Sequence, residues 1–430
     1  MKILASAYAC NPFYGSEEGV GWGWINAIAR NHEVWVITAG FHRADLEEAL
    51  RSQSERLRNL HFVYVEEKPW HYRRTAAWIK IESSILKPIM NWAYRLWLRD
   101  AFRLGTKLHN QIGFDLVHQI TYVGFRFPGH LWKLDIPFVW GPIGGLENTP
   151  WQLLPAMGMR GMIRFTGRNT INTLHRCLLR LPKRAFRKSG SGIIAATKSI
   201  QQQIKKWYGE DSTIICEIGA PIRIAGRHSR RETGDSLIIC WSGLHESRKA
   251  LPLALAALAT LPEGISWRLD VLGAGPCTKS WRQSAERLGI ASKCHWLGQT
   301  PRERALQIVA GSHLFVVSSL QDLTSTVLVE ALALGVPVLC PDHCGFSDVI
   351  DESCGRKLGI ATTREFIAEL GSAIEQIYED ELLRRRLAAG AIARAREYSW
   401  EKKALAIDAV YRGVTGRAKA HRPCSRRLSE

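Results

Sequence analysis

The chain has 430 residues, of which 46% are hydrophobic and 23% are charged, a composition typical of a soluble protein with room for two domains. Lys and Arg number 58 against 40 Asp and Glu, and the net charge of +18 predicts an anionic partner: a phosphorylated substrate, an acidic lipid surface or a nucleic acid. No run approaches the ~20 apolar residues of a membrane-spanning helix, and the start lacks the apolar length of a signal peptide. We expect a cytoplasmic protein, soluble or peripheral on the inner face of the membrane.

The first half of the chain alternates short apolar runs that predict strands with segments of helical spacing. They lie at residues 2–8, 19–31, 33–40, 44–59, 61–66, 114–121, 137–145 and 192–209. Residues 223–236 are basic, polar and turn-rich, and we predict a linker there. A second alternating run follows at 237–243, 249–261, 267–275, 280–290, 294–299, 301–311, 313–319, 326–335 and 336–341. Such alternation predicts an α/β protein with two doubly wound parallel sheets.

Helical spacing closes the chain at 364–380, 381–398 and 399–414. The tail at 416–430 is basic and lacks an apolar face, so we expect it to be disordered. The ten cysteines are scattered and form no Cys-x-x-Cys pair. No zinc site is predicted from them, and buried free thiols in a reducing compartment are expected.

Residues 318–339 read SSLQDLTSTVLVEALALGVPVL and place two acids, Asp322 and Glu330, around a predicted helix start. A buried strand precedes the helix, and the residues at 324–326 are good N-cap residues. Helix N-termini carry about half a positive charge and free N–H groups, so they attract phosphates. Glu330, about two turns into the helix, is then placed to bind hydroxyls of the same ligand. From these residues alone, a structural interpretation is equally good: Glu330 would be a partly exposed helix residue, and Asp322 would stabilise a turn in the loop.

Several motifs occur in one order along the chain, and the following quotations give them: SAYACNPFYGSEEGVGWGW, VHQITYVGFRFP, FVWGPIGG, WSGLHESRKALPLALAAL, LDVLGAGP, CHWLGQTPRERALQIVAGSHLFVVSS and DLTSTVLVEALALGVPVL. Together they resemble a bacterial subgroup of the retaining glycosyltransferases of family 4, over residues 1 to about 415. The resemblance implies the GT-B fold: two Rossmann-like domains facing a central cleft. It places an acceptor-binding domain at 1–222, a nucleotide-sugar-binding domain at 237–395, and a C-terminal helix at 396–415 that packs back toward the N-terminal domain.

The resemblance implies roles for the two acids. Glu330 matches the acid that binds the ribose hydroxyls of the nucleotide, and a carboxylate accepting two hydroxyls is a reasonable ribose clamp. Asp322 matches the acid that contacts hydroxyls of the donor sugar; the family has glutamate there, so this chain keeps the charge on a shorter side chain. The backbone at Thr324, Ser325 and Thr326 matches the segment that holds the diphosphate.

The cations of SGLHESRKAL extend this implied donor site from Gly243 onward. Lys249 matches the family's lysine that neutralises the diphosphate, and we count it with Asp322 as catalytic. The family's arginine after the glycine is replaced by Leu244, and Arg248 is predicted to supply the second cation. One such contact to a developing leaving-group charge is worth ~3–4 kcal/mol. A solvated pair at a helix start is the alternative.

The N-terminal motifs imply both donor and acceptor contacts. Gly15 and Ser16 are predicted to bind the donor, and with the glycines at 19 and 21 they would let backbone amides approach a phosphate or sugar. Glu17 and Glu18 are predicted to bind acceptor hydroxyls, or equally to charge the first turn of a helix. His118 is a catalytic candidate, although the second histidine of the family's pair is isoleucine here and a core histidine is the alternative.

Further acceptor-side predictions come from the same resemblance: Arg126, Gly144 and Gly145 face the cleft. The implied reaction is a hexosyl transfer with retention, in which the leaving phosphate oxygen accepts the acceptor's proton. No metal and no cofactor is required, since the cations take the metal's place. The predicted partners are a nucleotide-diphosphate-sugar and a saccharide or lipid-linked acceptor of bacterial surface polysaccharide or glycolipid synthesis.

The segment 70–111 interleaves tryptophans with Lys and Arg at near-helical spacing, which is typical of a helix in an anionic membrane interface. Residues 176–190 are a second basic amphipathic candidate, and solvated core helices are the alternative. Rival functions are a nucleotide-sugar epimerase or phosphorylase of the same fold, an inactive relative, and a non-enzymatic membrane- or nucleic-acid-binding protein. No helix-turn-helix, RRM or zinc-finger pattern supports nucleic acid as a partner.

Overall fold

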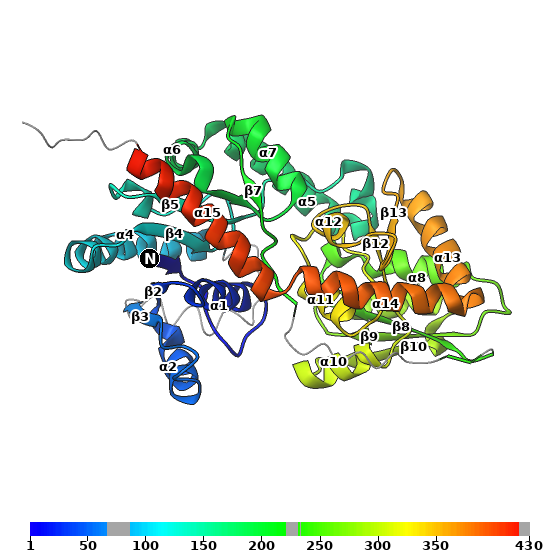
Figure 1. The fold of residues 1–430 in the computed structure, drawn as a ribbon. Helices are drawn as coiled ribbons and strands as arrows, with labels where there is room; N and C mark the ends of the chain where they lie inside the picture. Colours follow the sequence, from blue (N-terminus) through cyan, green and yellow to red (C-terminus); the bar gives the residue numbers. More distant parts are fainter. Residues whose placement is uncertain (67–86, 221–230, 233, 421–430) are drawn as a thin grey trace, which may run out of the picture. The chain divides into compact units, whose positions relative to one another are not determined.

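The computed structural model describes residues 1–66, 87–220, 231–232 and 234–420, and the chain folds into two compact units (Figure 1). The first unit comprises residues 1–146 and 175–217 together with the chain from 400 onward, and the second comprises 147–174 and 218–399. Residues 147–174 therefore group with the second unit, although the sequence analysis assigned them to the first. Most of the predicted linker at 223–236 lies outside the described residues.

The first unit is built on a seven-stranded sheet whose pairs are all parallel. In sheet order its strands are β3 (Leu60–Val65), β2 (Glu33–Ala39), β1 (Lys2–Ala7), β4 (Leu116–Thr121), β5 (Phe138–Ile143), β6 (Ile193–Ala195) and β7 (Thr213–Ile214). The central strands are buried on both faces, as expected for a parallel sheet covered by helices. The order reverses between β1 and β4, which makes their carboxyl ends the switch point of this sheet.

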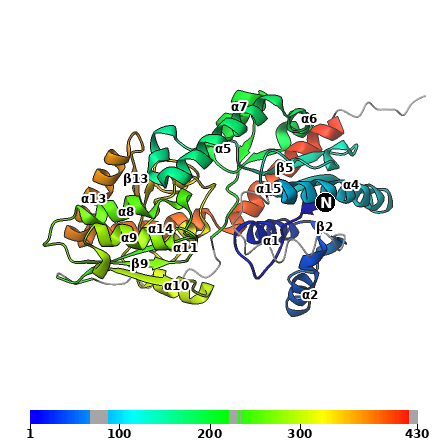
Figure 2. The same ribbon diagram turned by 180° about the vertical axis from the view of Figure 1, so that it is seen from behind.

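Helices cover both faces of the first sheet, and Figures 1 and 2 show the two sides. They are α1 (Ser16–Ala29), α2 (Arg43–Ser52), α4 (Lys87–Ile112), α6 (Arg180–Ser189), α7 (Lys198–Tyr208) and α15 (Trp400–Ala420), with α5 (Gly158–Leu178) running from the second unit into the first. Short 3-10 helices are η1 (Gly40–His42), η2 (Leu131–Lys133) and η4 (Gly190–Gly192). Thr197 caps α7 by accepting a hydrogen bond from the Ile200 N–H, and Gly209 ends it in the left-handed conformation.

The last helix, α15, packs against α1 and β5 of the first unit, so the predicted return of the C-terminal helix to the N-terminal domain is confirmed. An ideal Cβ at Gly23 of α1 would lie 2.1 Å from the Trp400 ring, so only glycine admits this approach. The helix continues to Ala420, so the start of the predicted tail is helical. The rest of that tail, 421–430, lies outside the described residues.

The second unit repeats the parallel, doubly wound pattern with six strands. In sheet order they are β10 (Cys294–Gly298), β9 (Trp267–Leu272), β8 (Leu237–Ser242), β11 (Leu314–Val316), β12 (Val338–Pro341) and β13 (Gly355–Leu358). Apolar side chains of this sheet and of the surrounding helices form one continuous core. Its switch point lies at the carboxyl ends of β8 and β11.

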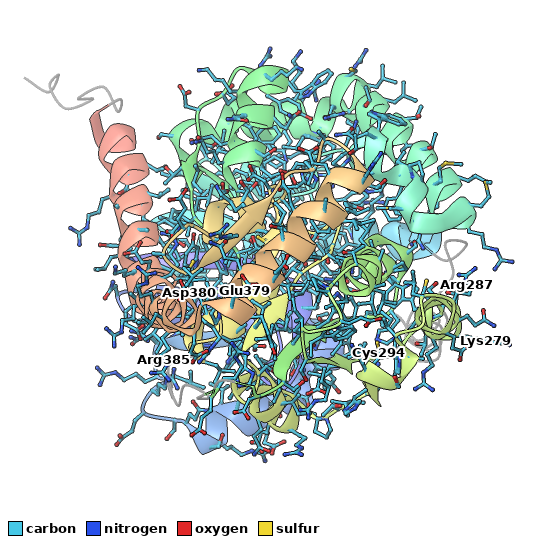
Figure 3. All side chains as sticks on the ribbon, turned by 90° about the vertical axis from the view of Figure 1, so that its right-hand side faces the viewer. Lys279, Arg287, Cys294, Glu379, Asp380 and Arg385 are labelled. Atoms are coloured by element: carbon cyan, nitrogen blue, oxygen red, sulfur yellow. The ribbon has the colours of Figure 1, made fainter. Side chains whose placement is uncertain are left out.

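Two helix layers enclose the second sheet, with α8 packed on α9 and α13, and α11 packed on α10 and α14. Their bounds are α8 (Leu251–Ala259), α9 (Thr278–Arg287), α10 (Arg302–Ala310), α11 (Thr326–Ala333), α12 (Phe346–Val349), α13 (Thr363–Glu379) and α14 (Glu381–Glu397), with η3 (Trp151–Met157), η5 (Ser247–Lys249) and η6 (Ala291–Lys293). Figure 3 shows side chains of both charges at the outer ends of these helices, among them Lys279, Arg287, Glu379, Asp380 and Arg385. This part of the surface therefore carries charges of both signs in contact with solvent.

The predicted membrane segment at 70–111 is only partly described by the structure. Residues 67–86 lie outside the described residues, so Trp70 and Trp78 are not placed. On α4, Trp97 is buried with Tyr94 in the core, which corrects its assignment to an exposed aromatic face, whereas Trp92 is exposed. None of the helices in the described ranges has the length and hydropathy needed to cross a membrane.

Candidate functional site

The loops after β8 and β11 meet at the switch point of the second sheet. The Leu320 N–H donates to the Arg248 carbonyl at 2.8 Å, and Ser318 Oγ donates to the Lys249 carbonyl at 2.8 Å. Trp241 Nε1 in turn donates to Ser318 Oγ at 3.0 Å. These bonds fix the two loops to each other, so the side chains that they carry are held at one edge of the sheet.

Asp322 lies between the two cations of the loop after β8. Lys249 Nζ donates a hydrogen bond to Asp322 Oδ2, and Arg248 Nη1 is 3.4 Å from Asp322 Oδ1. Arg248 also donates through Nε to Glu246 at 2.7 Å. Burial alone would raise the pKa of Asp322, but the charges of Lys249 and Arg248 outweigh it and hold that pKa below its usual range. The cluster therefore contains an ionised carboxylate between two cations.

The pKa of Arg248 is shifted upward, in the direction opposite to that of Asp322. Burial lowers the pKa of its guanidinium, and the carboxylates of Asp322 and Glu246 raise it by more, so the net shift is upward. Gly243 adjoins this cluster, since an ideal Cβ there would lie 3.7 Å from the Lys249 side chain. Leu244, where the family has arginine, is exposed. The structure thus brings together Asp322, Lys249, Arg248 and Gly243.

α11 begins at Thr326, four residues after Asp322. Ser325 is the N-cap residue, with extended backbone and no capping hydrogen bond from its own side chain. Thr324 and Ser325 are buried and Thr326 is half-buried. Gly345 is essential to this turn, because its N–H donates to the Leu323 carbonyl at 2.8 Å and an added Cβ would lie 2.0 Å from Thr324 Oγ1. A helix start of this kind presents backbone N–H groups and positive potential beside the cation cluster.

Glu330 lies on the same helix and forms a second pair with Arg302, the first residue of α10. The Glu330 side chain is 9% exposed and that of Arg302 is 63% exposed. Burial raises the pKa of Glu330, and the charge of Arg302 opposes the rise without cancelling it. The buried carboxylate is therefore paired with a cation that solvent reaches.

A glycine turn after β9 supports the loop after β8. Gly273 has φ of +105°, and an ideal Cβ there would lie 2.0 Å from the Gly243 carbonyl oxygen. His245 is buried beside it, with Nδ1 2.8 Å from Thr278 Oγ1 and its backbone N–H donating to the Ala274 carbonyl at 3.2 Å. This packing explains why LDVLGAGP accompanies the cation motif in the sequence.

In the first unit, the loop after β1 leads into α1 at the switch point of that sheet. Gly19 and Gly21 are required by packing, because ideal Cβ atoms would lie 2.9 Å from the Tyr14 carbonyl oxygen and 2.0 Å from that of Ala9. Their glycine identity is therefore explained by packing alone. Gly15 has open space around its Cβ position, and Ser16 has a φ of +57°.

The side chain of Glu17, in the first turn of α1, reaches the loop after β4. Its Oε1 accepts a hydrogen bond from the Val123 N–H at 2.7 Å. Burial raises the pKa of Glu17 to about 7, against the Val123 N–H, which lowers it, and with a smaller rise from the charge of Glu18. A carboxyl with a pKa near neutrality is a candidate for binding or proton transfer rather than a plain helix charge.

His118 lies in the core of the first unit, which corrects its predicted catalytic role. Its ring is fully buried on β4, with Nδ1 2.6 Å from the Tyr411 hydroxyl and Nε2 2.8 Å from the Gly141 carbonyl oxygen. Burial lowers its pKa to about 3, against the Gly141 hydrogen bond, which raises it, so the ring is neutral. The histidine joins β4, β5 and α15, which is the core alternative weighed in the sequence analysis.

Arg126, Gly144 and Gly145 lie together after β4 and β5. The two segments are joined by Gly144 N–H donating to the Val123 carbonyl at 2.7 Å and Phe125 N–H donating to the Gly144 carbonyl at 3.2 Å. Gly145 has φ of +78°, and an ideal Cβ there would lie 3.9 Å from Arg126 Nη1. The sequence motifs therefore meet at one edge of the first sheet.

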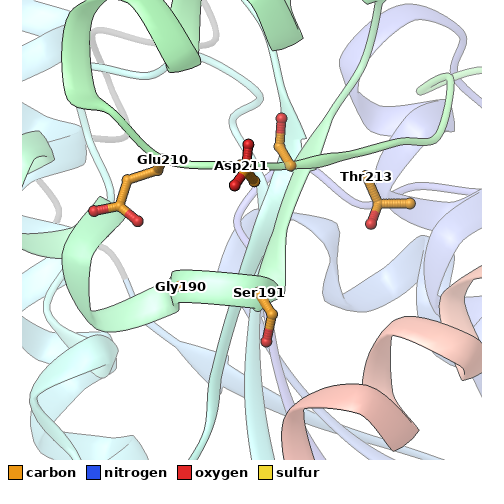
Figure 4. Close-up of a pocket in the computed structure, with 6 residues that line it drawn as sticks. Gly190, Ser191, Glu210, Asp211 and Thr213 are labelled. Atoms are coloured by element: carbon orange, nitrogen blue, oxygen red, sulfur yellow. The ribbon is translucent and has the colours of Figure 1, made fainter.

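Hollows elsewhere on the first unit lie at the opposite, amino edge of the sheet. Figure 4 shows one of about 440 Å³ that is lined by Gly190, Ser191 and the residues at 210–213, before β6 and β7. Another is lined by residues around the starts of β1, β2 and β4. Ligands of doubly wound sheets bind at the carboxyl ends, so neither is the candidate site. No cluster of three metal-ligating side chains occurs in the described part of the chain.

Sequence reasoning missed Arg302 and Cys344 as neighbours of the predicted acids. Arg302 meets Glu330 only because α10 and α11 pack together, and no spacing in the sequence signals that contact. Cys344, in the left-handed conformation, accepts a hydrogen bond through Sγ from the Asp322 N–H at 3.4 Å. The sequence analysis considered the cysteines only as possible metal ligands or buried free thiols.

Comparison with known proteins gives the second unit a family context. Residues 225–394 match the family model of glycosyl transferases group 1. The lipopolysaccharide glucosyltransferase WaaG of Escherichia coli is 30% identical over 126 residues, which are 29% of this chain and 33% of that protein. A D-inositol 3-phosphate glycosyltransferase of Nocardia farcinica is 26% identical over 226 residues, 48% of this chain and 49% of that protein. The chain thus spans about a third to a half of these relatives' lengths.

Solved structures share the fold over almost the whole chain. A sucrose-phosphate synthase from Thermosynechococcus elongatus has a TM-score of 0.64 at 15% identity, covering 97% of this chain and 99% of its own. The structure of WaaG has a TM-score of 0.58 at 19% identity, covering 95% and 99%. HepE from Anabaena in complex with UDP has a TM-score of 0.58 at 14% identity, covering 98% and 100%. The predicted fold class, GT-B with two Rossmann-like parallel-sheet domains, is confirmed.

Proposed function

We propose that this protein is a retaining, metal-independent glycosyltransferase of family 4, which moves a sugar from a nucleotide-diphosphate-sugar to a saccharide or lipid-linked acceptor in bacterial surface polysaccharide or glycolipid synthesis. The observation that carries the proposal is the cluster of Asp322, Lys249 and Arg248 beside the N-terminus of α11. It lies in the part of the chain that matches group 1 glycosyl transferases. HepE, which shares the fold, has been solved with UDP and with UDP-glucose.

The diphosphate is assigned to the cations and the helix start. The N–H groups at the start of α11 and the charges of Lys249 and Arg248 stabilise negative charge that develops on the leaving diphosphate. In the structure the Asp322 carboxylate forms ion pairs with both cations. Donor binding would therefore exchange one anionic partner of Lys249 for another and leave the Asp322 carboxylate to accept hydrogen bonds from sugar hydroxyls.

The ribose is assigned to Glu330. Its carboxylate is buried and yet bonded to an exposed arginine, so hydroxyl donors of a ligand can replace Arg302 without leaving a buried charge unpaired.

The sugar then passes to the acceptor as follows. The bond from the anomeric carbon to the diphosphate oxygen breaks, a bond to the acceptor oxygen forms on the same face, and the acceptor's proton goes to the diphosphate oxygen.

The acceptor is assigned to the first unit, at the loops after β1, β4 and β5. Glu17 supports this assignment, because its carboxyl lies at the carboxyl edge of the sheet with a pKa of about 7. In its ionised form it accepts hydrogen bonds from acceptor hydroxyls. Gly15 shortly precedes Glu17 in the sequence, and the space around its Cβ position is open.

We further propose that the protein docks on an anionic membrane surface through α5. The exposed side of this helix carries four large apolar side chains, Met159, Ile163, Ile171 and Leu174, while its buried side includes Phe165 and the polar Asn169. Apolar side chains exposed along one helix are available to enter a membrane interface. The chain from 148 to 209 contains twelve Lys or Arg and no Asp or Glu, so the surroundings of this face complement anionic lipid.

The function is tested by binding and slow hydrolysis of UDP-, GDP-, ADP- and dTDP-sugars, with and without EDTA. We expect one nucleotide class to bind, and Glu330→Ala to weaken it roughly 10- to 100-fold, the ~1.5–3 kcal/mol of hydrogen bonds to a charged group. Glu379→Ala, an exposed carboxylate on α13 of the same unit, is the matched control and should bind as the wild type does. Failure of every nucleotide sugar to bind the wild type contradicts the proposal. Turnover of the donor sugar without any acceptor, to an epimer, would favour the epimerase alternative.

A further inference from the structure

Helix α5 packs on the loop that carries the cations of the second unit. Its residues up to position 174 group with that unit. An ideal Cβ at Gly161 would lie 3.0 Å from Ser247 Cβ, so the absence of a side chain there lets the helix approach η5. Phe165, one turn later, is buried in the core of the second unit. Arg168 follows on the same face, because residues three and four apart are neighbours on a helix surface.

Arg168 contacts the loop after β11 through the side chain of Gln321. The Gln321 amide oxygen faces Arg168 in the orientation that its hydrogen-bond partners require, and it accepts from Arg168 Nε and from Nη1, both at 3.2 Å. Arg168 Nη1 also donates to the Glu147 carbonyl at 3.3 Å, which joins the guanidinium to the segment that leads into η3. Gln321 directly precedes Asp322. The guanidinium therefore holds the residue next to the carboxylate of the donor site.

The main chain at Gln321 and Asp322 is fixed by side chains of two other loops. Arg248 Nη1 donates to the Gln321 carbonyl at 3.1 Å, and the Asp322 N–H donates to Cys344 Sγ at 3.4 Å. Burial raises the pKa of the Cys344 thiol, and the charge of Arg168 opposes the rise, so Arg168 lies within electrostatic range of this thiol. These contacts hold the loop by groups other than the Asp322 carboxylate.

Such contacts matter most when a donor is bound. In the structure Lys249 Nζ donates a hydrogen bond to the Asp322 carboxylate. A diphosphate that takes Lys249 as its partner removes this bond. The position of Asp322 then depends on the contacts of its loop, and the contact between Gln321 and Arg168 is one of them.

We propose that Arg168 is a positioning residue of the donor site, which holds Asp322 through Gln321 while that carboxylate binds hydroxyls of the donor sugar. The inference rests on the proposed function for the role of Asp322. A guanidinium that donates through two nitrogens fixes the direction of the amide more closely than a single donor does. A misplacement of about 1 Å at a reacting centre can cost ~10²-fold in rate. Arg168 lies outside residues 225–394, so the matching family model does not include it.

The test compares Arg168→Ala, Arg168→Lys and Gln321→Ala in the full-length protein. For hydrolysis of the nucleotide sugar selected by the binding panel, we expect kcat/KM to fall about 10- to 100-fold in both alanine variants. Arg168→Lys, which keeps one donor, should lose less. Calorimetry should find the wild-type affinity for the nucleoside diphosphate in all three variants, because the proposed ligands of the diphosphate are Lys249, Arg248 and the start of α11.

A double variant and a control complete the set. Arg168→Ala combined with Gln321→Ala should lose no more than either single variant, because both changes remove the same contact. Arg287→Ala, an exposed arginine at the end of α9, should match the wild type in both measurements (Figure 3).

Hydrogen exchange reports on the loop without any ligand. The Asp322 N–H is bonded to Cys344, and loosening of the loop exposes this amide to solvent. The peptide that contains residues 320–324 should exchange faster in Arg168→Ala and Gln321→Ala, and at the wild-type rate in Arg287→Ala. Gln321→Ala leaves α5 unchanged, so this variant decides the question even if Arg168→Ala does not fold.

Alanine variants that match Arg287→Ala in activity and in hydrogen exchange overturn the inference, and so do additive losses in the double variant. A loss of diphosphate affinity in Arg168→Ala that Gln321→Ala does not share would make Arg168 a direct ligand of the donor, which also overturns it. If no nucleotide sugar binds the wild type, the proposed function fails, and hydrogen exchange still decides whether Arg168 holds the loop. Nucleotide binding by the wild type with unchanged alanine variants refutes the positioning role alone.

Discussion

The two switch points of the molecule hold their cations in opposite settings. In the second unit, Lys249 and Arg248 share the carboxylate of Asp322, whose pKa they hold low against the effect of burial. In the first unit, burial lowers the pKa of Arg126 and Arg176, and Arg126 is bonded to a neutral histidine. The second unit therefore holds a carboxylate between its two cations, whereas Arg126 of the first unit is bonded to a neutral ring. The difference teaches that a diphosphate bound in the second unit has to exchange with an anionic partner that is already in place.

The largest expected effect comes from removing the charge of Lys249, one of the two cations paired with Asp322. Lys249→Met keeps the length of the side chain and removes the charge that offsets the leaving diphosphate. We expect transfer to fall ~10²–10³-fold, the loss seen when one preorganised contact to developing charge is removed. Initial rates with the donor identified by the binding panel measure it.

The control for this variant is Lys279→Met on α9, an exposed lysine of the same unit (Figure 3). It should transfer at the wild-type rate. If Lys249→Met and Lys279→Met behave alike, the cation cluster has no role in leaving-group stabilisation and the comparison between the two switch points loses its functional meaning.

A smaller effect is expected from the titration of Glu17. Its pKa of about 7 means that the carboxylate forms as the pH rises through neutrality. If the ionised form binds the acceptor hydroxyl, acceptor kcat/KM rises about tenfold from pH 6 to pH 8, in step with the ionised fraction. Asp322, with its lowered pKa, stays ionised throughout this range and adds no inflection.

The pH profile of Glu17→Gln should be flat over the same interval. A profile that keeps the wild-type inflection would show that another group titrates, and Glu17 would then be only a charge in the first turn of α1. Glu18→Gln is the neighbouring control, and its profile should retain the rise.

The smallest expected effect concerns the apolar side of α5. The double substitution Met159→Ser and Ile163→Ser should weaken binding to phosphatidylglycerol vesicles about fivefold, since ~1 kcal/mol is lost when these side chains are only partly transferred from water. Co-sedimentation measures it, with Leu382→Ser and Leu405→Ser as the exposed apolar control. Equal binding of the wild type to phosphatidylcholine vesicles would contradict charge-assisted docking.

The parallel sheets, the helix order and the return of the last helix could all be predicted, because strand and helix periods alternate clearly along the chain. The cluster of Asp322 with Lys249 could be anticipated only through family motifs, since the two residues lie on loops after β11 and β8 that become neighbours through the sheet order. His118 was misjudged because a strand histidine looks the same in sequence whether it faces a ligand or, as here, Tyr411. The role of Gly19 and Gly21 could not be decided from the sequence, because glycine serves close backbone packing as readily as ligand access.

The α5 face was not anticipated from sequence for a different reason. Its apolar residues at 159, 163, 171 and 174 have the helical spacing of a core stripe, and periodicity alone assigns such a stripe to the interior. Only the structure shows that these apolar residues are exposed and that the buried side includes Asn169 and Asn172, which are bonded to backbone carbonyls of Thr149 and Glu147. Hydrophobic spacing locates a face of a helix but does not say what covers it.

The exchange of partners at the donor site is tested most directly by the affinity of Asp322→Asn for the nucleoside diphosphate of the donor. If Asp322 competes with the diphosphate for Lys249 and Arg248, calorimetry should find binding equal to or tighter than that of the wild type, while sugar transfer is lost. If instead the affinity falls as it does in Lys249→Met, Asp322 is needed to hold the cations in place, and the account of the donor site as an exchange of anions is wrong.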